Sequence, residues 1–407
     1  MLVALAGLAL AAVPGDGDVE TYVEEALTRH PDLEADRSAW RASQERIPSH
    51  RSLPDPRVTV GGFVQSVETR VGPQQVRLGV QQAIPWPSRL VHAGRAAEME
   101  AQASQWEVEA TERKVRERVE VAYWRLWLVR AQQTLRTEHL TLLDGLAAAV
   151  RGRVEVGQAS LADLQQVDLS RSRLEDALAS LAAEEDARIA ALRASVGGDL
   201  DSTVTREEPG AVRVPSGDLT PAMHPRLRAL DALGSSADHR VRSAAGRRLP
   251  DLTVGADWIV TGPARMNGVP DSGKDAVALG VGLQVPLWQG VYGHDVAAAR
   301  HVADSLRARL RAREDELVAE VGATAARVRD TARRVDTVEQ TLLPQARAAY
   351  EAVLGEYTVG RAQVAQTLLA QRDLLDLALD RVEAQAAHRI QWARLSALTG
   401  FLPGDPP

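Results

Sequence analysis

The 407-residue sequence contains no cysteine, so disulfide bonds and thiol catalysis are excluded. Aromatic residues make up only 4% of the chain, and lysine occurs only at Lys114 and Lys274. Arginine therefore carries almost all the positive charge, and the formal net charge of −7 provides no basic surface for nucleic acid. The hydrophobic content of 45% consists mainly of Ala, Leu and Val, a composition that favours long helices over a mixed globular core.

Catalytic and ligand-binding motifs are also missing or incomplete. Residues 268–274 follow the phosphate-binding loop pattern, but Asp275 replaces the final Ser or Thr, and a strand pattern rather than a helix follows. The nine histidines include no pair at the i, i+4 spacing of a zinc-peptidase helix. His294 and His301 are seven residues apart, where a solvated or capping role is favoured over a metal site. The sequence predicts no enzyme, no catalytic residue, no metal site and no cofactor.

An apolar run from Leu2 to Val13 ends in small residues near the start of the sequence. This pattern predicts a secretory signal peptide over residues 1–12. No later stretch has the length and hydrophobicity of a membrane-spanning helix. A membrane-spanning form of this chain would therefore need a closed β-barrel, because lipid offers no partners to an unpaired backbone.

Residues 277–285 alternate without interruption between apolar side chains and small or polar ones. Such a strand suits the wall of a membrane barrel, whose outer face contacts lipid. Pro286 ends the strand, and Trp288 and Tyr292 follow where amphipathic rings favour the membrane–water boundary. Trp86 follows an earlier strand in the same way; these three rings are predicted to be interfacial, with ordinary packing as the alternative. The predicted lipid-facing residues are Val277, Leu279, Val281, Leu283 and Val285.

The sequence contains an internal duplication. Val359-Gly360 repeats Val156-Gly157 after 203 residues, and several other short motifs recur in the same order. The first predicted repeat, residues 18–198, consists of a helix, a β-hairpin over 58–84, a long helix, a tip turn and a returning helix. The second repeat, residues 220–400, follows the same order with its hairpin over 252–285. Residues 199–219 are predicted to be a linker and residues 401–407 a short tail.

The predicted helices carry seven-residue spacings typical of coiled-coil seams. In the second repeat this seam consists of Val321, Val328, Val335 and Leu342. Trp124 and Trp127, three residues apart in the first long helix, are predicted to be packing residues. The fold is therefore expected to be mainly α with a small β part. Taken alone, the seams would favour a structural coiled-coil protein of the envelope without a pore.

Together these features resemble the TolC-like outer-membrane efflux proteins. The resemblance is strongest at Leu53-Pro54-Asp55-Pro56, at Gln82-Ala83-Ile84-Pro85-Trp86-Pro87 and at the two Val-Gly turns, and the first two segments look most like the heavy-metal (CzcC-like) branch. The resemblance implies an outer-membrane homotrimer with four strands per protomer in one lipid-embedded β-barrel and a periplasmic α-barrel of helices. It also implies two partners, an inner-membrane efflux pump and a periplasmic adaptor protein.

The resemblance also suggests residue roles. The adaptor-docking tips would be Val156, Gly157, Gln158, Val359, Gly360 and Arg361. Asp163 falls where many members carry an aspartate, but Gln366 and Leu369 stand where some members place acidic gate residues, so the family gate is not carried over to the second repeat. A tunnel that is closed at rest should narrow where the returning helices of the second repeat crowd near the tip. The candidate gate or pore residues are therefore Asp163, Gln366, Asp373 and Asp376. An ion pair between Arg361 and Asp163 would hold the closed state. The alternative for Asp373 and Asp376 is that they face water or pair with Arg372 on the same helix.

Overall fold

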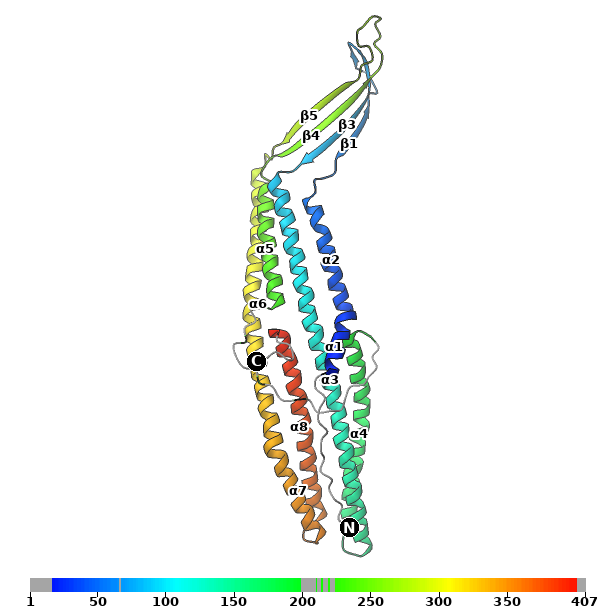
Figure 1. Cartoon of the computed structure of the whole chain (residues 1–407), viewed down its shortest axis with the longest axis vertical. Coiled ribbons are helices and arrows are strands. Elements are labelled where there is room, and N and C mark those ends of the chain that lie inside the picture. The colour runs from blue at the N-terminus through cyan, green and yellow to red at the C-terminus, as the bar shows by residue number, and fades with distance from the viewer. Residues whose placement is uncertain are drawn as a thin grey trace. The chain divides into compact units, whose positions relative to one another are not determined.

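The computed structural model describes residues 17–65, 67–198, 210, 214, 219 and 224–400 (Figure 1). The expected signal peptide, the expected tail and nearly all of the expected linker lie outside these residues. The described chain is mainly helical with one small sheet, which confirms the predicted fold class. Contacts divide it into two compact units. One contains the described residues of Met1–Ala35, Glu109–His224 and Glu314–Pro407, and the other contains the described residues of Asp36–Val108 and Pro225–Arg313.

The helices of the first half follow proline and glycine signals in the sequence. Helices α1 (Gly17–Arg29) and α2 (Pro31–Arg51) are separated at His30, because proline disfavours a helical residue before it. Helix α3 (Pro87–Glu155) starts with proline, whose missing N–H costs nothing there. Helix α4 (Leu161–Val196) ends at Gly197 in the left-handed conformation. No helix in the described ranges has an apolar stretch long enough to cross a bilayer.

The second half contains α5 (Pro225–Gly246), α6 (Gln289–Thr337), a π-helical turn η1 (Val338–Leu342), α7 (Leu343–Thr358) and α8 (Val364–Thr399). The π turn corrects the predicted seam. Val321, Val328 and Val335 are buried as expected, but Leu342 is exposed, and the buried positions continue at Tyr350 and Tyr357. One extra residue in the π turn shifts the seven-residue repeat by one position, so that the half-buried Leu343 replaces Leu342.

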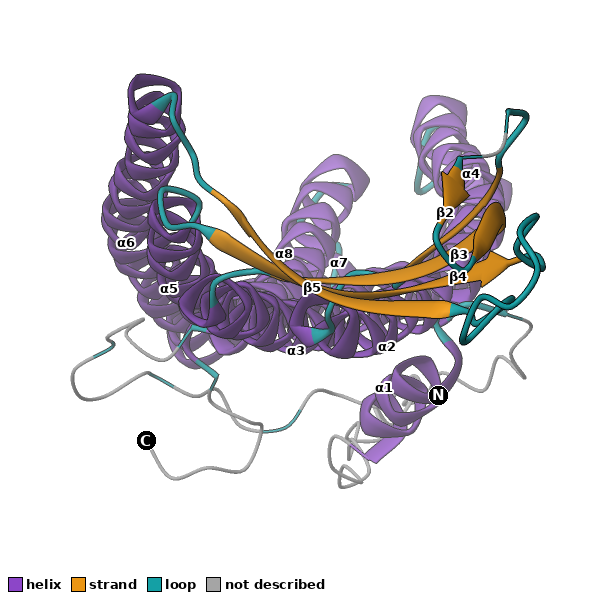
Figure 2. Ribbon diagram, turned by 90° about the horizontal axis from the view of Figure 1, so that it is seen from above, coloured by secondary structure: helices purple, strands orange, loops and turns teal. Residues whose placement is uncertain are grey.

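The sheet is antiparallel with the strand order β1-β3-β4-β5, where β1 is Arg57–Gly62, β3 is Gly72–Ile84, β4 is Asp251–Thr261 and β5 is Ala276–Gln284. Within the hairpin predicted over 58–84, the first strand ends at Gly62, and a separate short strand β2 (Glu68–Thr69) pairs with β3. Figure 2 shows the four long strands side by side in one curved sheet. Two hairpins, one from each half of the chain, are joined through β3 and β4.

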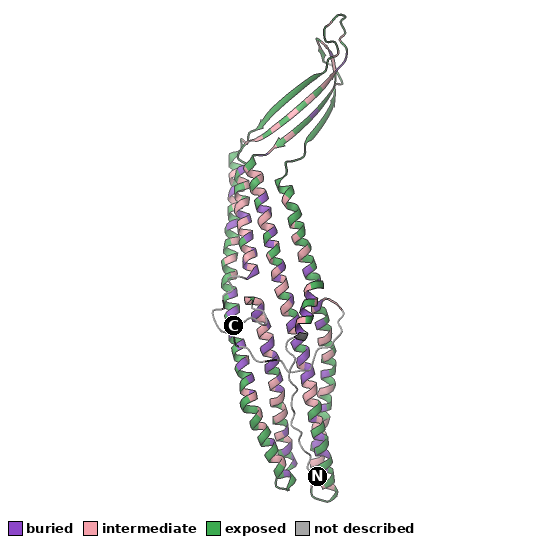
Figure 3. Ribbon diagram, in the orientation of Figure 1, coloured by how far each residue is buried: buried purple, intermediate pink, exposed green. Residues whose placement is uncertain are grey.

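The larger hydrophobic core belongs to the first unit. Trp127, Leu126, Val115 and Val119 of α3 pack there with Val23 of α1, and residues of α4 and α8 complete the cluster. Trp124 lies 6.0 Å from Trp127 between ring centres, in an edge-to-face arrangement. Both tryptophans are therefore packing residues, as predicted. In contrast, Figure 3 shows the sheet as largely exposed.

Candidate functional site

The sheet has two chemically different faces, both uncovered in the single chain. Cross-strand pairs such as Leu252 with Leu283 and Val254 with Val281 put apolar side chains on the same face. The apolar face consists of Val58, Val60, Val76, Leu78, Val80, Ile84, Leu252, Val254, Trp258, Val260, Val277, Leu279, Val281 and Leu283, together with Gly62, Gln82 and Ala256. Leu279 and Val281 are 85% and 77% exposed. Side chains this apolar and this exposed require a partner other than water.

The opposite face carries small and polar side chains. Gly255 lies directly opposite Gly280, and Gly79 lies directly opposite Thr59 on β1 and diagonal to Gly255 on β4. The alternation predicted for residues 277–285 therefore extends over all four strands, and it puts Ala276, Ala278, Gly280, Gly282 and Gln284 on this face. Val285 follows the end of β5 and is exposed.

Each edge strand pairs on one side only within the described chain, β1 with β3 and β5 with β4. The remaining N–H and C=O groups of β1 and β5 therefore face outward from the sheet. Of the aromatic residues predicted at the boundary, Trp86 and Trp288 are exposed, with Trp288 at 76%, whereas Tyr292 is half-buried.

The two tip turns have the same geometry. Gly157 and Gly360 adopt φ values of 72° and 76°, which glycine reaches without strain. In the first tip Gln158 N donates to Arg153 O at 2.7 Å, and in the second tip Arg361 N donates to Glu356 O at 2.9 Å. This glycine cap closes the preceding helix in both cases. All six predicted docking residues are exposed, with Val156 and Val359 at 67% each.

The returning helices start with matching capping boxes. The backbone N and the Oγ of Ser160 donate to one carboxylate oxygen of Asp163, at 3.0 and 2.8 Å. Gln363 N donates to Gln366 Oε1 at 3.0 Å in the second repeat. Two of the four candidate gate residues therefore cap the first turn of a helix. In the single described chain the Asp163 carboxylate binds the start of its own helix, and its pairing with Arg361 in the closed state stays a prediction.

The other candidate gate residues lie deeper in α8. Asp373 and Asp376 are both exposed. Arg372 Nε lies 3.7 Å from Asp376 Oδ2, which is the intrahelical pairing expected as the alternative. Both side chains of this pair are more than 60% exposed, so the pairing contributes little to stability. Neither observation tests a role in gating.

The two tips also contact each other. Leu146, Val150 and Val167 of the first repeat pack with Tyr357 and Val364 of the second in one apolar cluster. Arg153 Nη2 donates to the carbonyl oxygens of Tyr357 and Thr358, at 2.9 and 3.0 Å. These groups come from residues about 200 positions apart, so the sequence pattern did not reveal the contact.

Residues 22–198 and 218–401 match the outer membrane efflux protein family. The chain belongs to this family. A curated relative, the outer membrane efflux protein BepC of Brucella suis, is 25% identical over 295 residues, which span 70% of this chain and 62% of BepC. The matching part thus covers less than two thirds of that relative.

Solved structures share the fold. The outer membrane protein VceC of Vibrio cholerae has a TM-score of 0.77 at 21% identity, covering 94% of this chain and 96% of VceC. CusC has a TM-score of 0.80 at 14% identity, covering 96% of this chain and 95% of CusC. The family assignment favours an efflux protein over a structural coiled-coil protein without a pore. The chain is thus an outer-membrane protein whose helical part lies in the periplasm.

The sequence pattern did not reveal a contact between two histidines or a cavity between two helices. His92 of α3 and His239 of α5 are 147 residues apart, yet their Nδ1 atoms lie 3.2 Å apart. Burial lowers the pKa of both imidazoles, and Arg95 and Arg242 lower it further. Both rings are therefore mostly neutral at pH 7. No group of three or more potential metal ligands occurs in the described part of the chain.

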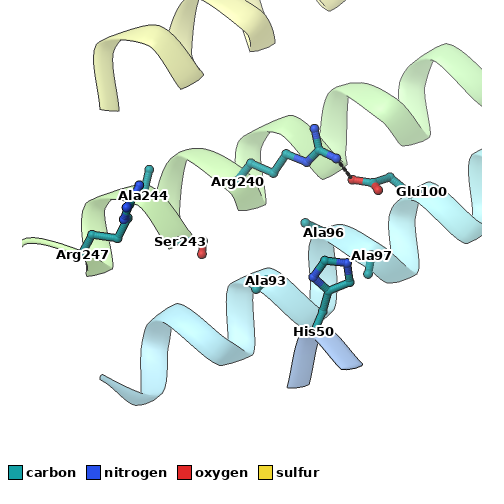
Figure 4. Close-up of a pocket in the computed structure, with 9 residues that line it drawn as sticks. All are labelled: His50, Ala93, Ala96, Ala97, Glu100, Arg240, Ser243, Ala244 and Arg247. Atoms are coloured by element: carbon teal, nitrogen blue, oxygen red, sulfur yellow. Dashed lines mark ion pairs between the residues drawn. The ribbon is translucent and has the colours of Figure 1, made fainter. Parts of the chain in front are cut away.

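A cavity of about 280 Å³ lies between α3 and α5, lined largely by small residues such as Ala93, Ala96 and Ala244 (Figure 4). Its charged groups are already paired, because Arg240 lies 2.6 Å from Glu100 and Arg247 lies 3.1 Å from Asp295. Figure 4 shows the ion pair between Arg240 of α5 and Glu100 of α3 at this cavity.

Proposed function

We propose that the protein is the outer-membrane duct of a tripartite efflux system. It would be a homotrimer that conducts small solutes or metal cations passively, without a catalytic step. An inner-membrane pump would supply the energy, and a periplasmic adaptor would connect the pump to the tips. The proposal agrees with the family to which the chain belongs.

The observation that carries this proposal is the sheet with one apolar and one small or polar face. A membrane barrel presents its apolar face to lipid and its polar face to the lumen. Four strands cannot close such a barrel, since the smallest known have about 8 strands. The strands alternate in direction from β1 to β5, so the β5 edge of one copy can continue antiparallel with the β1 edge of the next. Three copies would supply the twelve strands that the resemblance implies.

The tips are the proposed adaptor-docking surface. Val156 and Val359 expose apolar side chains beside glycines that permit a tight helix reversal. Gln158 and Arg361 would add polar contacts at the third position of each turn. No described residue covers either valine, so these small apolar surfaces are free for a partner helix.

The resting gate is proposed to involve α8 near the tip. In a trimer, exposed Asp373 and Asp376 would form acidic rings if they face the axis, and symmetry would multiply their charge. Gln366 and Asp163 hold capping positions, so they would support the gate by fixing where the helices begin.

We propose that the pump determines which solute the duct transports. The resemblance to the heavy-metal branch stays a hypothesis, which a deletion strain can test. Sensitivity to divalent metals that the intact gene relieves would support it, and sensitivity to organic drugs alone would contradict it.

The duct proposal can be tested with the same arginine on the two faces of β5. Val281→Arg should destabilise membrane assembly by about 2–4 kcal/mol, because the charge would face lipid near the midplane. Gly280→Arg is the matched control, since the space around Gly280 on the polar face is open within 4 Å. The control should assemble in the outer-membrane fraction. Equal assembly of the two variants would contradict the membrane orientation of this sheet.

A further inference from the structure

The polar face of the sheet holds one bidentate ion pair at mid-strand. Arg77 of β3 donates from Nε to Asp257 Oδ1 at 2.9 Å and from Nη2 to Asp257 Oδ2 at 2.8 Å. The two residues occupy diagonal positions on neighbouring strands, because Asp257 lies directly opposite Gly79 in the register. Planar guanidinium and carboxylate groups in this arrangement form the strongest class of side-chain hydrogen bonds.

A glycine makes this pairing possible. A Cβ atom at Gly79 would lie 2.5 Å from Asp257 Oδ1 and 2.5 Å from Thr59 Oγ1. The side chains of both neighbours therefore lean over the backbone of β3 into space that any other residue would fill. The sequence Arg77-Leu78-Gly79 thus places a charge on the polar face and, two residues later, the room for its partner.

Arg77 and Asp257 are also the charged residues in the middle of the polar face. Of the polar-face residues in the four long strands, only Arg57, Arg77, Asp251 and Asp257 are charged. Arg57 and Asp251 are the first residues of their strands, and Asp251 accepts from Trp86 N at 3.1 Å and from Arg89 Nη1 at 3.3 Å. In the middle of the sheet, Ile259 lies opposite Arg77, and the other neighbours of the pair are small residues such as Gly255, Ala278 and Gly280.

We infer that Arg77 and Asp257 control the ion preference of the strand section of the duct, because each cancels the charge of the other. The inference rests on the proposed function, in which the polar face lines the lumen. Removal of one partner would leave one uncompensated charge per protomer, and a symmetric oligomer would turn this charge into a ring. A ring of one sign raises the local concentration of counter-ions and makes a pore selective. The natural pair would instead let solutes of either sign pass.

Reversal potentials of the purified oligomer in planar bilayers test the inference. Asp257→Asn should shift the ratio of anion to cation permeability several-fold toward anions, and Arg77→Gln should shift it toward cations. The double variant with both substitutions is the matched control and should return to the unmodified ratio. The shifts should be largest near 0.01 M salt, where the Debye length is about 30 Å, and small near 1 M salt, where it is about 3 Å.

A second measurement tests the inference if a single variant does not assemble. The chain has no cysteine, so Arg77→Gln with Asp257→Cys can be assembled first and then labelled at one position. A positively charged thiol reagent should shift the permeability ratio toward anions, and a negatively charged reagent should shift it toward cations.

Normal conductance with an unchanged ratio after labelling and in both single variants would overturn the role of the pair. Absence of any conductance from the unmodified protein would instead contradict the proposed duct, so the two failures are distinguishable.

Discussion

The guanidinium group of Arg153 lies over the ring of Tyr357, 4.3 Å from the ring centre. It joins the last turn of α3 to the last turn of α7 and so couples the tips of the two repeats. Arg153→Gln should lower the free energy of local opening of the tips by about 1–2 kcal/mol, because a cation–π contact and two charge-assisted hydrogen bonds are lost.

Hydrogen exchange can measure this opening. Amides near residues 150–167 and 354–368 should exchange faster in Arg153→Gln, while Arg151→Gln, a substitution at an exposed arginine one half-turn away, should leave them unchanged. Equal exchange in both variants would show that the contact does not hold the tips together.

A bulky residue at the second tip should block docking of the adaptor. Gly360→Trp combines steric bulk with a backbone conformation that tryptophan adopts only with strain, at a φ of 76°. Export should be lost, while the oligomer should remain in the outer membrane. Gly355→Ala, where the space around the added methyl group is open, is the control for substitution in α7. Intact export by Gly360→Trp would argue against docking at this tip.

Neutralising the acidic residues of α8 tests the proposed gate. Asp373→Asn combined with Asp376→Asn should reduce cation preference in planar bilayers, most strongly at low salt. Asp168→Asn combined with Asp176→Asn in α4 provides a comparison of equal charge change. The same selectivity before and after the double substitution would place the constriction elsewhere on the helices.

A buried histidine should make stability depend on pH. His388 is 2% exposed, and burial, together with the positive charge of Arg389, lowers its pKa to about 4; a hydrogen bond with the backbone of Val328 opposes this shift only partly. The unfolded chain takes up the proton near pH 6.5, whereas the folded chain does so near pH 4. Stability is therefore complete above about pH 6.5 and falls by about 3 kcal/mol as the pH drops toward 4.

Thermal unfolding between pH 4 and pH 7.5 can measure this loss. His388→Gln should flatten the decline, because no group then has to stay neutral in the core, whereas His301→Gln at an exposed position should leave it unchanged. A decline of equal size in the unmodified protein and in His388→Gln would assign the acid sensitivity to other groups.

The sequence alone determined the elements and their kind. Apolar side chains at every second residue predicted the strand over 277–285. This alternation can be recognised from the sequence without knowing which strand pairs with it. Glycine and proline defined where helices end and begin, because their conformational limits act at the residue itself: Gly157 and Gly360 follow helix ends, and Pro87 begins α3. Repetition of these signals revealed the duplication, and the order of elements led to the family that the comparison confirmed.

Only the tertiary structure decided which distant residues meet. Arg153 and Tyr357, Arg77 and Asp257, and His92 and His239 are each separated by more than 140 residues, and no periodic pattern links their positions. The π turn before Pro344 likewise moved the buried seam from Leu342 to Leu343, because one residue inserted in a helix rotates every side chain that follows. Periodicity fixes which side of an element is apolar, but the facing partner depends on packing between segments far apart in the chain.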